Sequence, residues 1–410
     1  MRRMKTAITV LLSALLFLTG CSGKTESSSG NLTPDDIFSG GTPDIEGYEI
    51  PSTMVEISSQ QLVTNIRFGW NLGKSLESCI SDLDGNEIAD VTPEEGKTVD
   101  ETLWGNPPAT EKLFQTLVES GINAVRLPIT WRDHVNENFD IDEDWLNRVK
   151  QVVDYAYNSG MYVIITMYHD GAADEDFGAW LRDAANDYNT AISRYNHLWE
   201  QICDKFYTYN ERLLYESMNE VEFSSISEDE AYDLLNRINQ DFVNTVRNSG
   251  RNNARRHLVI AGYDADISKT CDERFIMPED EVGKLILSLH YYAPLTFCKY
   301  SIQDYWGNPS EQAWMQNQIE ALRSTFVDRG IPVMITEYGA KGSDTASRVF
   351  FCEKLTQLCR SNYIAAFLWD DGSELDRETL KWNTPELIDA LIRGSSGRIY
   401  TPKKDKEISD

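Results

Sequence analysis

The sequence predicts a single (β/α)8 barrel, and three observations lead to this fold class. Eight short apolar, strand-like runs alternate along the chain with stretches of helical periodicity, an order typical of parallel strands joined by helices. Two helical stretches end in Ser-Gly stop signals just before a strand begins, at Gly121 and Gly160. A doubly wound open sheet is the rival arrangement, but no G-x-G-x-x-G follows any of the runs, which weakens its dinucleotide-binding form.

The expected elements fill one globular region, which we expect to occupy residues 53–400 as a single α/β domain. The expected strands are 66–72, 124–127, 162–167, 213–216, 257–262, 285–290, 333–337 and 365–369. The helices with the clearest periodicity are 145–159, 191–207, 230–249, 311–328 and 347–361.

The N-terminal segment predicts a processed leader and a lipid anchor. Residues 1–5 are basic, residues 7–18 form an apolar run too short to span a bilayer comfortably, and small residues precede Cys21. This pattern resembles a bacterial lipoprotein signal at 1–20, with cleavage before Cys21 and lipid on its thiol. An ordinary secretory leader that happens to contain a cysteine is the alternative. We expect an extracytoplasmic protein held in a membrane through Cys21, at the cell surface or facing the periplasm.

The segments that flank the globular region have the composition of flexible chain. Residues 21–52 are rich in Ser, Gly, Thr, Pro and acidic residues without any period, which is typical of a disordered linker. A coil of about 30 residues reaches roughly 30 Å, enough to hold a domain clear of a membrane surface. Residues 401–410 form a charged tail.

The composition narrows the class of partner. The formal net charge of −28 repels nucleic acid and anionic lipid, so a neutral substrate is favoured, and we expect the protein to act as a monomer. The ten Trp and nineteen Tyr residues suit stacking on sugar rings, although most aromatic side chains serve the core. The six cysteines after Cys21 show no metal-binding or disulfide spacing, and we expect them to be mostly reduced and buried.

Two expected strands lead directly to a glutamate. Glu337 ends the strand 333–337, and Glu220 follows the strand 213–216 by four residues. For either glutamate alone, a capping or salt-bridged role is the simpler interpretation. For the pair we favour catalysis, because an unpaired buried charge is costly and ionisable groups at the C-terminal ends of barrel strands cluster in active sites.

Other polar and aromatic side chains recur at the same ends of successive strands. Each has a structural explanation on its own, such as an ion pair for Arg126 or core packing for His290 and Trp369. Their recurrence at one face of the barrel favours a functional site. The candidates beyond the two glutamates are Asn71, Arg126, Tyr168, His169, Asp170, Asn219, His290, Tyr292 and Trp369.

Two carboxyl groups on different strands are the minimum equipment for glycoside hydrolysis. A retaining mechanism needs them about 5–5.5 Å apart, one ionised to attack the anomeric carbon and one protonated to assist the leaving oxygen. The negative charge of the first is expected to raise the pKa of the second, and its loss on glycosylation lets the second act as a base. This chemistry requires no metal and no organic cofactor.

Several motifs resemble glycoside hydrolase family five, the cellulase family of retaining barrel enzymes, over about residues 68–372. The tryptophan-containing segments look most like subfamily four, which holds endo-glucanases and xyloglucanases. The matching motifs are Gly69-Trp70-Asn71-Leu72-Gly73, Glu101-Thr102-Leu103-Trp104-Gly105-Asn106-Pro107, Val125-Arg126-Leu127-Pro128-Ile129-Thr130-Trp131 with His134, Ser217-Met218-Asn219-Glu220, His290-Tyr291-Tyr292-Ala293-Pro294, Glu337-Tyr338-Gly339 and Trp369-Asp370.

The resemblance implies a role for each matched residue. Glu220 is the implied acid/base and Glu337 the implied nucleophile, with Arg126 and Tyr292 orienting Glu337. Asn219 is implied to hydrogen-bond the sugar 2-hydroxyl. The remaining implied substrate-binding or supporting residues are Asn71, Trp104, His134, Tyr168, His169, His290 near the acid/base, and Trp369 under the cleaved sugar.

The chain departs from the family pattern at four positions near this site. Tyr168 stands where a sugar-binding histidine is usual, and Val221 where proline commonly follows the acid/base. Lys74 and Asp371 each replace an asparagine. Both glutamates are retained, and Tyr168 and Lys74 are expected to alter preference or rate.

The sequence therefore predicts a retaining endo-β-1,4-glucanase that cleaves cellulose-like, mixed-linkage or xyloglucan chains. Endo-β-mannanase or xylanase activity on the same fold is one alternative. A surface glycan-binding lipoprotein on a decayed barrel is another, motivated by Tyr168 and opposed by the retention of Glu220, Glu337 and Asn219.

Overall fold

A computed structural model describes residues 53–81, 92–94, 96–171 and 179–396. The predicted signal peptide at 1–20, the lipidated Cys21, the linker 21–52 and the tail 401–410 lie outside the described residues and stay predictions. In the described part, no helix is long and apolar enough to cross a membrane. The six cysteines after Cys21 are unpaired there, and all but Cys271 are buried.

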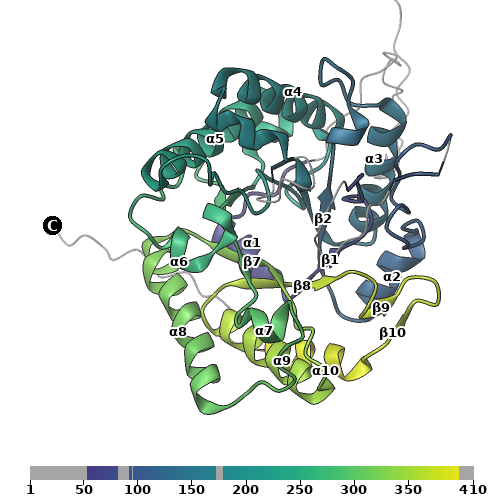
Figure 1. Cartoon of the computed structure of the whole chain (residues 1–410), viewed down its shortest axis with the longest axis vertical. Helices are drawn as coiled ribbons and strands as arrows, with labels where there is room; N and C mark the ends of the chain where they lie inside the picture. Colours follow the sequence, from purple (N-terminus) through teal and green to yellow (C-terminus); the bar gives the residue numbers. More distant parts are fainter. Residues whose placement is uncertain (1–52, 82–91, 95, 172–178, 397–410) are drawn as a thin grey trace, which may run out of the picture. The chain divides into compact units, whose positions relative to one another are not determined.

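Eight parallel strands form a closed barrel in which each strand pairs with the next and β8 pairs with β1. The (β/α)8 fold class is therefore confirmed. Helices surround the strands (Figure 1). The strands are β1 (Gly69–Leu72), β2 (Ala124–Ile129), β3 (Tyr162–Met167), β4 (Leu213–Glu216), β5 (Leu258–Ala261), β6 (Leu285–Tyr291), β7 (Val333–Tyr338) and β8 (Ala365–Asp370).

The strand predictions hold with small shifts at the ends. β3 and β4 have the predicted bounds, and β2 runs two residues further because Pro128 and Ile129 still pair with β3. β1 begins at Gly69 instead of residue 66, because helix α1 (Ser59–Asn65) ends with Ile66 as its cap. Arg67 and Phe68 connect this cap to the start of β1.

The five predicted helices are all present, with bounds that differ by up to three residues, and most begin at a side-chain cap. Ser227 and Asn308 form capping boxes with Glu230 and Glu311, which satisfies two free amide groups at each helix start. The longer helices are α2 (Glu111–Glu119), α3 (Glu143–Asn158), α4 (Tyr188–Phe206), α5 (Glu228–Asn248), α8 (Pro309–Thr325), α9 (Thr345–Ser361) and α10 (Pro385–Ser395).

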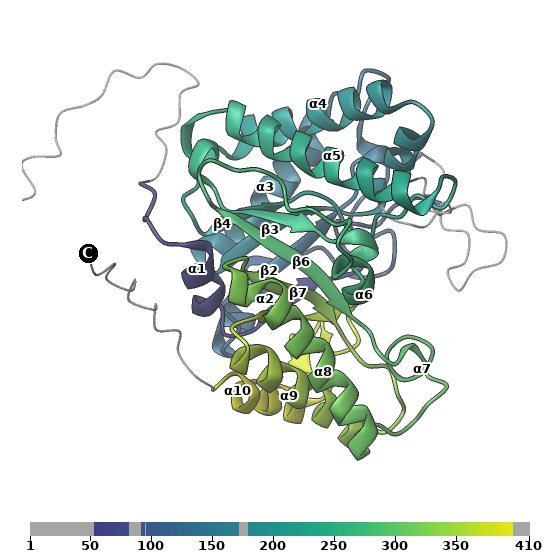
Figure 2. The same ribbon diagram turned by 90° about the vertical axis from the view of Figure 1, so that its left-hand side faces the viewer.

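The N-terminal half of the barrel interior is an apolar core. Inward-facing residues from β2 to β8 meet there in one buried cluster, which Leu62 and Val63 of α1 complete from below. Figure 2 shows α1 at one end of the strands, and the short helices α6 (Ile267–Thr270) and α7 (Leu295–Cys298) at the other. The strand members of the cluster are Ala124, Ile164, Leu214, Val259, Ile286, Met334, Ala365 and Phe367.

The next inward-facing layer is polar, because side chains two residues apart on a strand point to the same face. Two residues beyond Ala124, Ile164 and Leu214 come Arg126, Thr166 and Glu216, all buried. The same step leads to Ser288 on β6 and Thr336 on β7. The barrel therefore changes from an apolar to a polar filling one layer before its C-terminal end, and this layer carries the site.

Gly69 is required where β1 and β8 approach each other inside the barrel. A Cβ atom at this position would lie 2.1 Å from a ring carbon of Phe367, whereas a Cβ at Gly339 would meet its nearest neighbour at 3.7 Å. We predict that Gly69→Ala lowers the free energy of unfolding by about 1–3 kcal/mol, because the Phe367 ring has to move within a packed core. Urea unfolding measures this, with Gly339→Ala as the matched control. Equal stabilities of the two variants would contradict this packing.

Candidate active site

The polar layer is centred on Arg126, which β2 places, fully buried, inside the barrel. Its Nε donates to Glu216 at 2.5 Å, and its Nη2 donates to Asn219 at 2.9 Å. Its Nη1 donates to Asn71 at 3.1 Å and to Glu337 at 2.5 Å. Burial disfavours the charged guanidinium, but the carboxylates of Glu216 and Glu337 raise the pKa of Arg126, so this group stays cationic. The Arg126 side chain of β2 thus contacts residues of β1, β4 and β7, and one residue of the segment that follows β4.

Glu216 is a functional residue that the sequence reasoning missed. It is fully buried at the end of β4 and accepts hydrogen bonds from Thr166 and Ser288 in addition to Arg126. The available signal was a carboxylate that follows an apolar run and faces inward two residues after Leu214. Its position below the guanidinium fixes Arg126 from underneath, so its role is positioning.

The Glu337 carboxylate is held from two sides at the end of β7. One oxygen accepts from Arg126, and the other accepts from the Tyr292 hydroxyl at 3.0 Å. The Nε2 atom of His290 lies 3.6 Å from Glu337. Two donated hydrogen bonds therefore hold this nearly buried carboxylate in one position.

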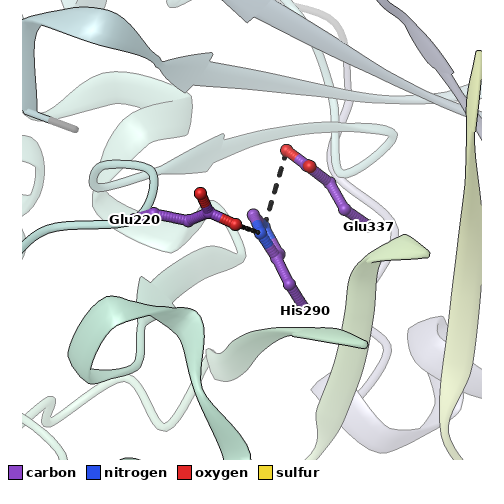
Figure 3. Close-up of side chains that lie close together, drawn as sticks. All are labelled: Glu220, His290 and Glu337. Carbon is purple, nitrogen blue, oxygen red and sulfur yellow. Dashed lines mark hydrogen bonds and ion pairs between the residues drawn. The ribbon is translucent and has the colours of Figure 1, made fainter. Parts of the chain in front are cut away.

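Glu220 faces Glu337 across the imidazole of His290. The Nδ1 atom of His290 lies 2.6 Å from an oxygen of Glu220, and Figure 3 shows the ring between the two carboxylates. One oxygen of Glu220 and one of Glu337 lie within 4.8 Å of each other. This separation matches the close pair of a retaining glycosidase and is too short for the water-spanning pair of an inverting one.

The protonation state of Glu220 differs from the expectation that Glu337 alone suggested. Burial raises its pKa, but the Lys299 ammonium, 4.0 Å away, and the hydrogen bond with His290 outweigh burial and lower it. The pKa of Glu220 is therefore lowered in spite of the neighbouring Glu337 carboxylate. An ionised carboxylate can only accept, so in the short contact the imidazole Nδ1–H of His290 donates to Glu220.

Aromatic rings line the space beside the two carboxylates. Tyr168 stacks on Trp369 with ring centroids 5.8 Å apart, and its edge meets His169 at 4.7 Å. Trp104 packs edge-on against His169 at 5.5 Å and donates to the backbone of Cys79. Burial first, and then the nearby glutamates, raise the pKa of Tyr168 well above its usual value. Tyr168 is therefore a neutral hydroxyl beside the pair, where a histidine is usual.

His134 is not brought to the glutamates. Its ring stacks on Trp145 of α3 at 3.8 Å between centroids, and it lines a different hollow of about 730 Å³ with Glu101 and Arg148. Burial lowers the pKa of His134 to about 4, so the ring is neutral near pH 7. Within the described part of the chain, His134 makes no hydrogen bond, ion pair or ring contact with Glu220 or Glu337, so the structure gives no support to the substrate-binding role that the resemblance implied.

Two of the departures from the family pattern contact each other. The Lys74 ammonium lies 3.6 Å from the Asp371 carboxylate, and Lys341 lies 3.9 Å from the same group. Asp371 directly follows β8, so the pair adjoins Trp369. An ion pair here replaces two neutral amides, which explains how both positions changed without leaving a lone charge.

The sequence that forms this site also matches the model of a known family. A model described as cellulase, glycosyl hydrolase family 5, matches residues 82–374, well over half of the chain. The chain belongs to glycosyl hydrolase family 5. It is therefore a glycoside hydrolase, and the resemblance found in its motifs is confirmed.

Individual relatives match most of this chain. Cellulase/esterase CelE of Acetivibrio thermocellus is 33% identical over 362 residues, covering 83% of this chain and 41% of CelE. The chain thus spans less than half the length of that relative. A broad-specificity GH5-4 endoglucanase from Ruminococcus champanellensis with bound cellotriose is 31% identical with a TM-score of 0.75, covering 83% of this chain and all of that one.

A second solved family 5 structure is a xyloglucanase from Paenibacillus pabuli in complex with ligand. It is 29% identical with a TM-score of 0.74, and the match covers 82% of this chain and all of that one. The similarity to subfamily four that the motifs indicated is confirmed by these structures.

Glu220, His290 and Glu337 each offer a donor atom within 4.8 Å of the other two, so their spacing alone suits a divalent ion. The surrounding charges oppose one. Arg126 already binds Glu337, and Lys299 faces Glu220, so a further cation is repelled at short range. The chemistry of this family 5 pair also needs its carboxylates free for proton and glycosyl transfer.

The Tyr292 hydroxyl provides a sharp test of how Glu337 is held. We predict that Tyr292→Phe lowers kcat on β-glucan about tenfold or more, because a hydrogen bond to a charged group is lost. Tyr291→Phe is the matched control, since the Tyr291 hydroxyl is buried without a hydrogen-bond partner among the described residues. Steady-state kinetics measure both variants, and equal rates would contradict the assigned contact.

Proposed function

We propose that this family 5 enzyme is a retaining endo-β-1,4-glucanase with Glu337 as nucleophile and Glu220 as acid/base. The observation that carries the proposal is the pair of carboxylate oxygens within 4.8 Å of each other at the C-terminal end of the barrel. Arg126 and Tyr292 on Glu337, and His290 on Glu220, distinguish the two carboxylates. Glu337 contacts a guanidinium and a phenol, and Glu220 contacts an imidazole.

In the first step, an oxygen of Glu337 forms a bond to the anomeric carbon while the glycosidic C–O bond breaks. Glu220 enters this step as the carboxylic acid, gives its proton to the leaving oxygen and becomes the carboxylate, and the departing chain is released with a free hydroxyl. The negative charge of Glu337 is consumed in the new ester bond. Arg126, which lies below Glu337, then keeps only the charge of Glu216 as its full partner.

In the second step, water attacks the anomeric carbon from the side that the leaving group has vacated. Glu220 accepts the proton of this water, and the ester bond to Glu337 breaks and restores its carboxylate. Two inversions at one carbon return the original configuration. Asn219, which Arg126 holds at 2.9 Å, lies beside the pair and suits a hydrogen bond to the 2-hydroxyl of the cleaved sugar.

The relatives support a β-1,4-linked glucan as substrate. One structural neighbour is described as a broad-specificity endoglucanase with cellotriose, and another as a xyloglucanase. Xyloglucan is therefore the second candidate substrate. The stacked Tyr168 and Trp369 offer apolar ring faces for a sugar, while no contact among the described residues favours the mannanase, xylanase or non-catalytic alternatives.

The membrane anchor remains part of the proposal. The lipoprotein signal before Cys21 and the linker 21–52 motivate an extracytoplasmic enzyme tethered to a membrane, acting on chains outside the cell. Cys21→Ser should move the enzyme from the membrane fraction to the soluble fraction. An unchanged distribution would reject lipidation of Cys21 as the anchor.

A substrate panel tests the proposed activity. We predict that the enzyme releases reducing ends from barley β-glucan and xyloglucan, lowers their viscosity early in the reaction, and keeps its rate in excess chelator. Mannan and xylan should be cleaved at least about tenfold more slowly, since a mispaired polar site rejects its analogue strongly. Binding without release on every substrate would instead support the non-catalytic alternative.

Azide rescue tests the two assigned roles separately. Glu337→Ala should lose activity, and azide should restore turnover to an α-glycosyl azide, because the anion fills the vacated nucleophile position. Glu220→Ala should lose roughly 10²–10⁴-fold in rate on unactivated chains, and azide should give the β-azide. NMR of the products reads the anomer. The opposite assignment of anomers would exchange the roles of the two glutamates.

A further inference from the structure

A hollow of about 440 Å³ opens beside Glu220, lined by Asp264, Lys299, Tyr300 and Trp314 among others. Its volume lies within the roughly 300–1,000 Å³ range of ligand pockets. The elements that carry its wall, α6, α7 and α8, lie on one side of the barrel (Figure 1). Glu220 forms part of this wall, so the hollow adjoins the proposed acid/base.

Trp314 is exposed at this hollow without a role in the core. Helix α8 packs on the barrel through Met315, Ile319 and Leu322, while the Trp314 side chain keeps 58% of its surface accessible. Leaving a large indole in water forgoes the free energy of burial. A flat indole in the wall of a polar hollow suits stacking on a sugar ring.

Lys299 is the only lysine or arginine among the described residues that line this hollow, which His290 also lines. Its ammonium lies 4.0 Å from Glu220 and 4.7 Å from the centre of the Tyr292 ring. Within the described part of the chain it makes no hydrogen bond, although an ammonium has three donors. The C-cap position of Lys299 on α7 fixes where its side chain begins. The donors are therefore available to a ligand in the hollow.

The other charged groups around Glu220 are already paired. His290 of β6 contacts Glu220, and Arg126 of β2 binds Glu337 of β7. The ring of His169, which does not line the hollow, is buried, and burial lowers its pKa to about 3, so it carries no charge near pH 7.

Asp264 of η7 (Tyr263–Ala265) lies near Glu220 in the same wall. Its carboxylate accepts from Lys269 at 2.7 Å, and Lys269 also binds Glu222 at 3.2 Å. Lys269 is already paired with two carboxylates. Lys299 is thus the cation whose charge acts on Glu220 from the side of the hollow.

We propose that this hollow is the leaving-group subsite, where Trp314 stacks on a sugar ring of the departing glucan and Lys299 donates to hydroxyls of the sugar next to the scissile bond. The proposal rests on the function proposed above. The leaving oxygen must meet the proton held at Glu220, so the sugar attached to it extends into the space beside that carboxylate. The hollow with Lys299 and Trp314 is this space.

Lys299 has a second consequence for the reaction. After the leaving chain departs, its ammonium faces Glu220 again and favours the carboxylate that must take the proton of the incoming water. Lys299 therefore acts on the chemistry through Glu220, as a positioning and electrostatic residue, as well as by contact with the leaving sugar.

Two substrates separate the leaving-group side from the rest of the site. Cellopentaose fills the hollow, whereas 2,4-dinitrophenyl β-cellobioside places only a small aryl group there, which leaves without a proton. Trp314→Ala should lower kcat/KM on cellopentaose roughly tenfold, change the distribution of its cleavage products, and leave the aryl substrate within about twofold. Trp314→Tyr should recover much of the loss, because a ring face is retained.

Tyr305→Ala is the matched control for the Trp314 variants. Tyr305 is 71% exposed and does not line the hollow, so both substrates should be cleaved at the wild-type rate. Unchanged cellopentaose kinetics for Trp314→Ala, or equal losses on both substrates, would overturn the assignment of the subsite.

The pH profile tests Lys299. Removal of its positive charge disfavours the carboxylate, so Glu220 keeps its proton to higher pH. Lys299→Met should therefore move the basic limb of kcat/KM on cellopentaose upward by about one pH unit, while Lys112→Met, which removes an exposed lysine of α2, should not. An unmoved limb for Lys299→Met would reject its action on Glu220.

The outcomes distinguish this subsite from the function on which it rests. If the wild-type enzyme cleaves neither substrate, the proposed function fails. If it cleaves both and the Trp314 and Lys299 variants behave like the controls, the function stands and the leaving-group subsite is wrong.

Discussion

The arrangement of the site depends on one buried cation, the guanidinium of Arg126. It reaches from β2 to Glu337 on β7 and to Glu216 on β4, and its remaining donors hold Asn71 and Asn219. Loss of one partner from a buried ion pair typically costs about 3–5 kcal/mol, because the other charge stays behind uncompensated. The same contacts therefore stabilise the fold and position the site. A change of Glu216 or Glu337 should affect both stability and activity.

This arrangement gives the two catalytic candidates unlike environments. Glu337 accepts from Arg126 and Tyr292, whereas Glu220 contacts His290 and faces Lys299. A carboxylate held in position by two donors suits attack. A carboxyl beside an imidazole and an ammonium suits proton transfer in both directions. The difference in surroundings, not in residue type, separates the roles.

Much of this site could be predicted from sequence because strand geometry imposes it. The period of two along β2 places Arg126 inward. Glu337 comes one residue after the inward-facing Thr336, where the pairing register of β7 shifts, so its place at the strand end, and not the period, predicted it. The inward position of Glu216 follows from the same period of two. It was missed because Glu220, four residues later, already accounted for the catalytic carboxyl expected after this strand.

Contacts between distant loops could not be predicted in the same way. Lys299 comes from a short helix after β6, and nothing in its local sequence indicates that it faces Glu220. The Lys74–Asp371 ion pair joins residues nearly 300 positions apart, so each looked like an independent departure. His134 belongs to a matched motif yet stacks on Trp145. The positions of Lys299, the Lys74–Asp371 pair and His134 all depend on how loops pack in three dimensions, which has no periodic signal in the sequence.

The central claim is that the side chain of residue 337 attacks the sugar while residue 220 manages the proton across a short gap. Incubation with a 2-deoxy-2-fluoro-β-cellobioside that carries a good leaving group should trap the glycosyl-enzyme, and peptide mass spectrometry should place the label on Glu337. The label on Glu220 or on any other residue, or full turnover without a trapped species, would contradict the account.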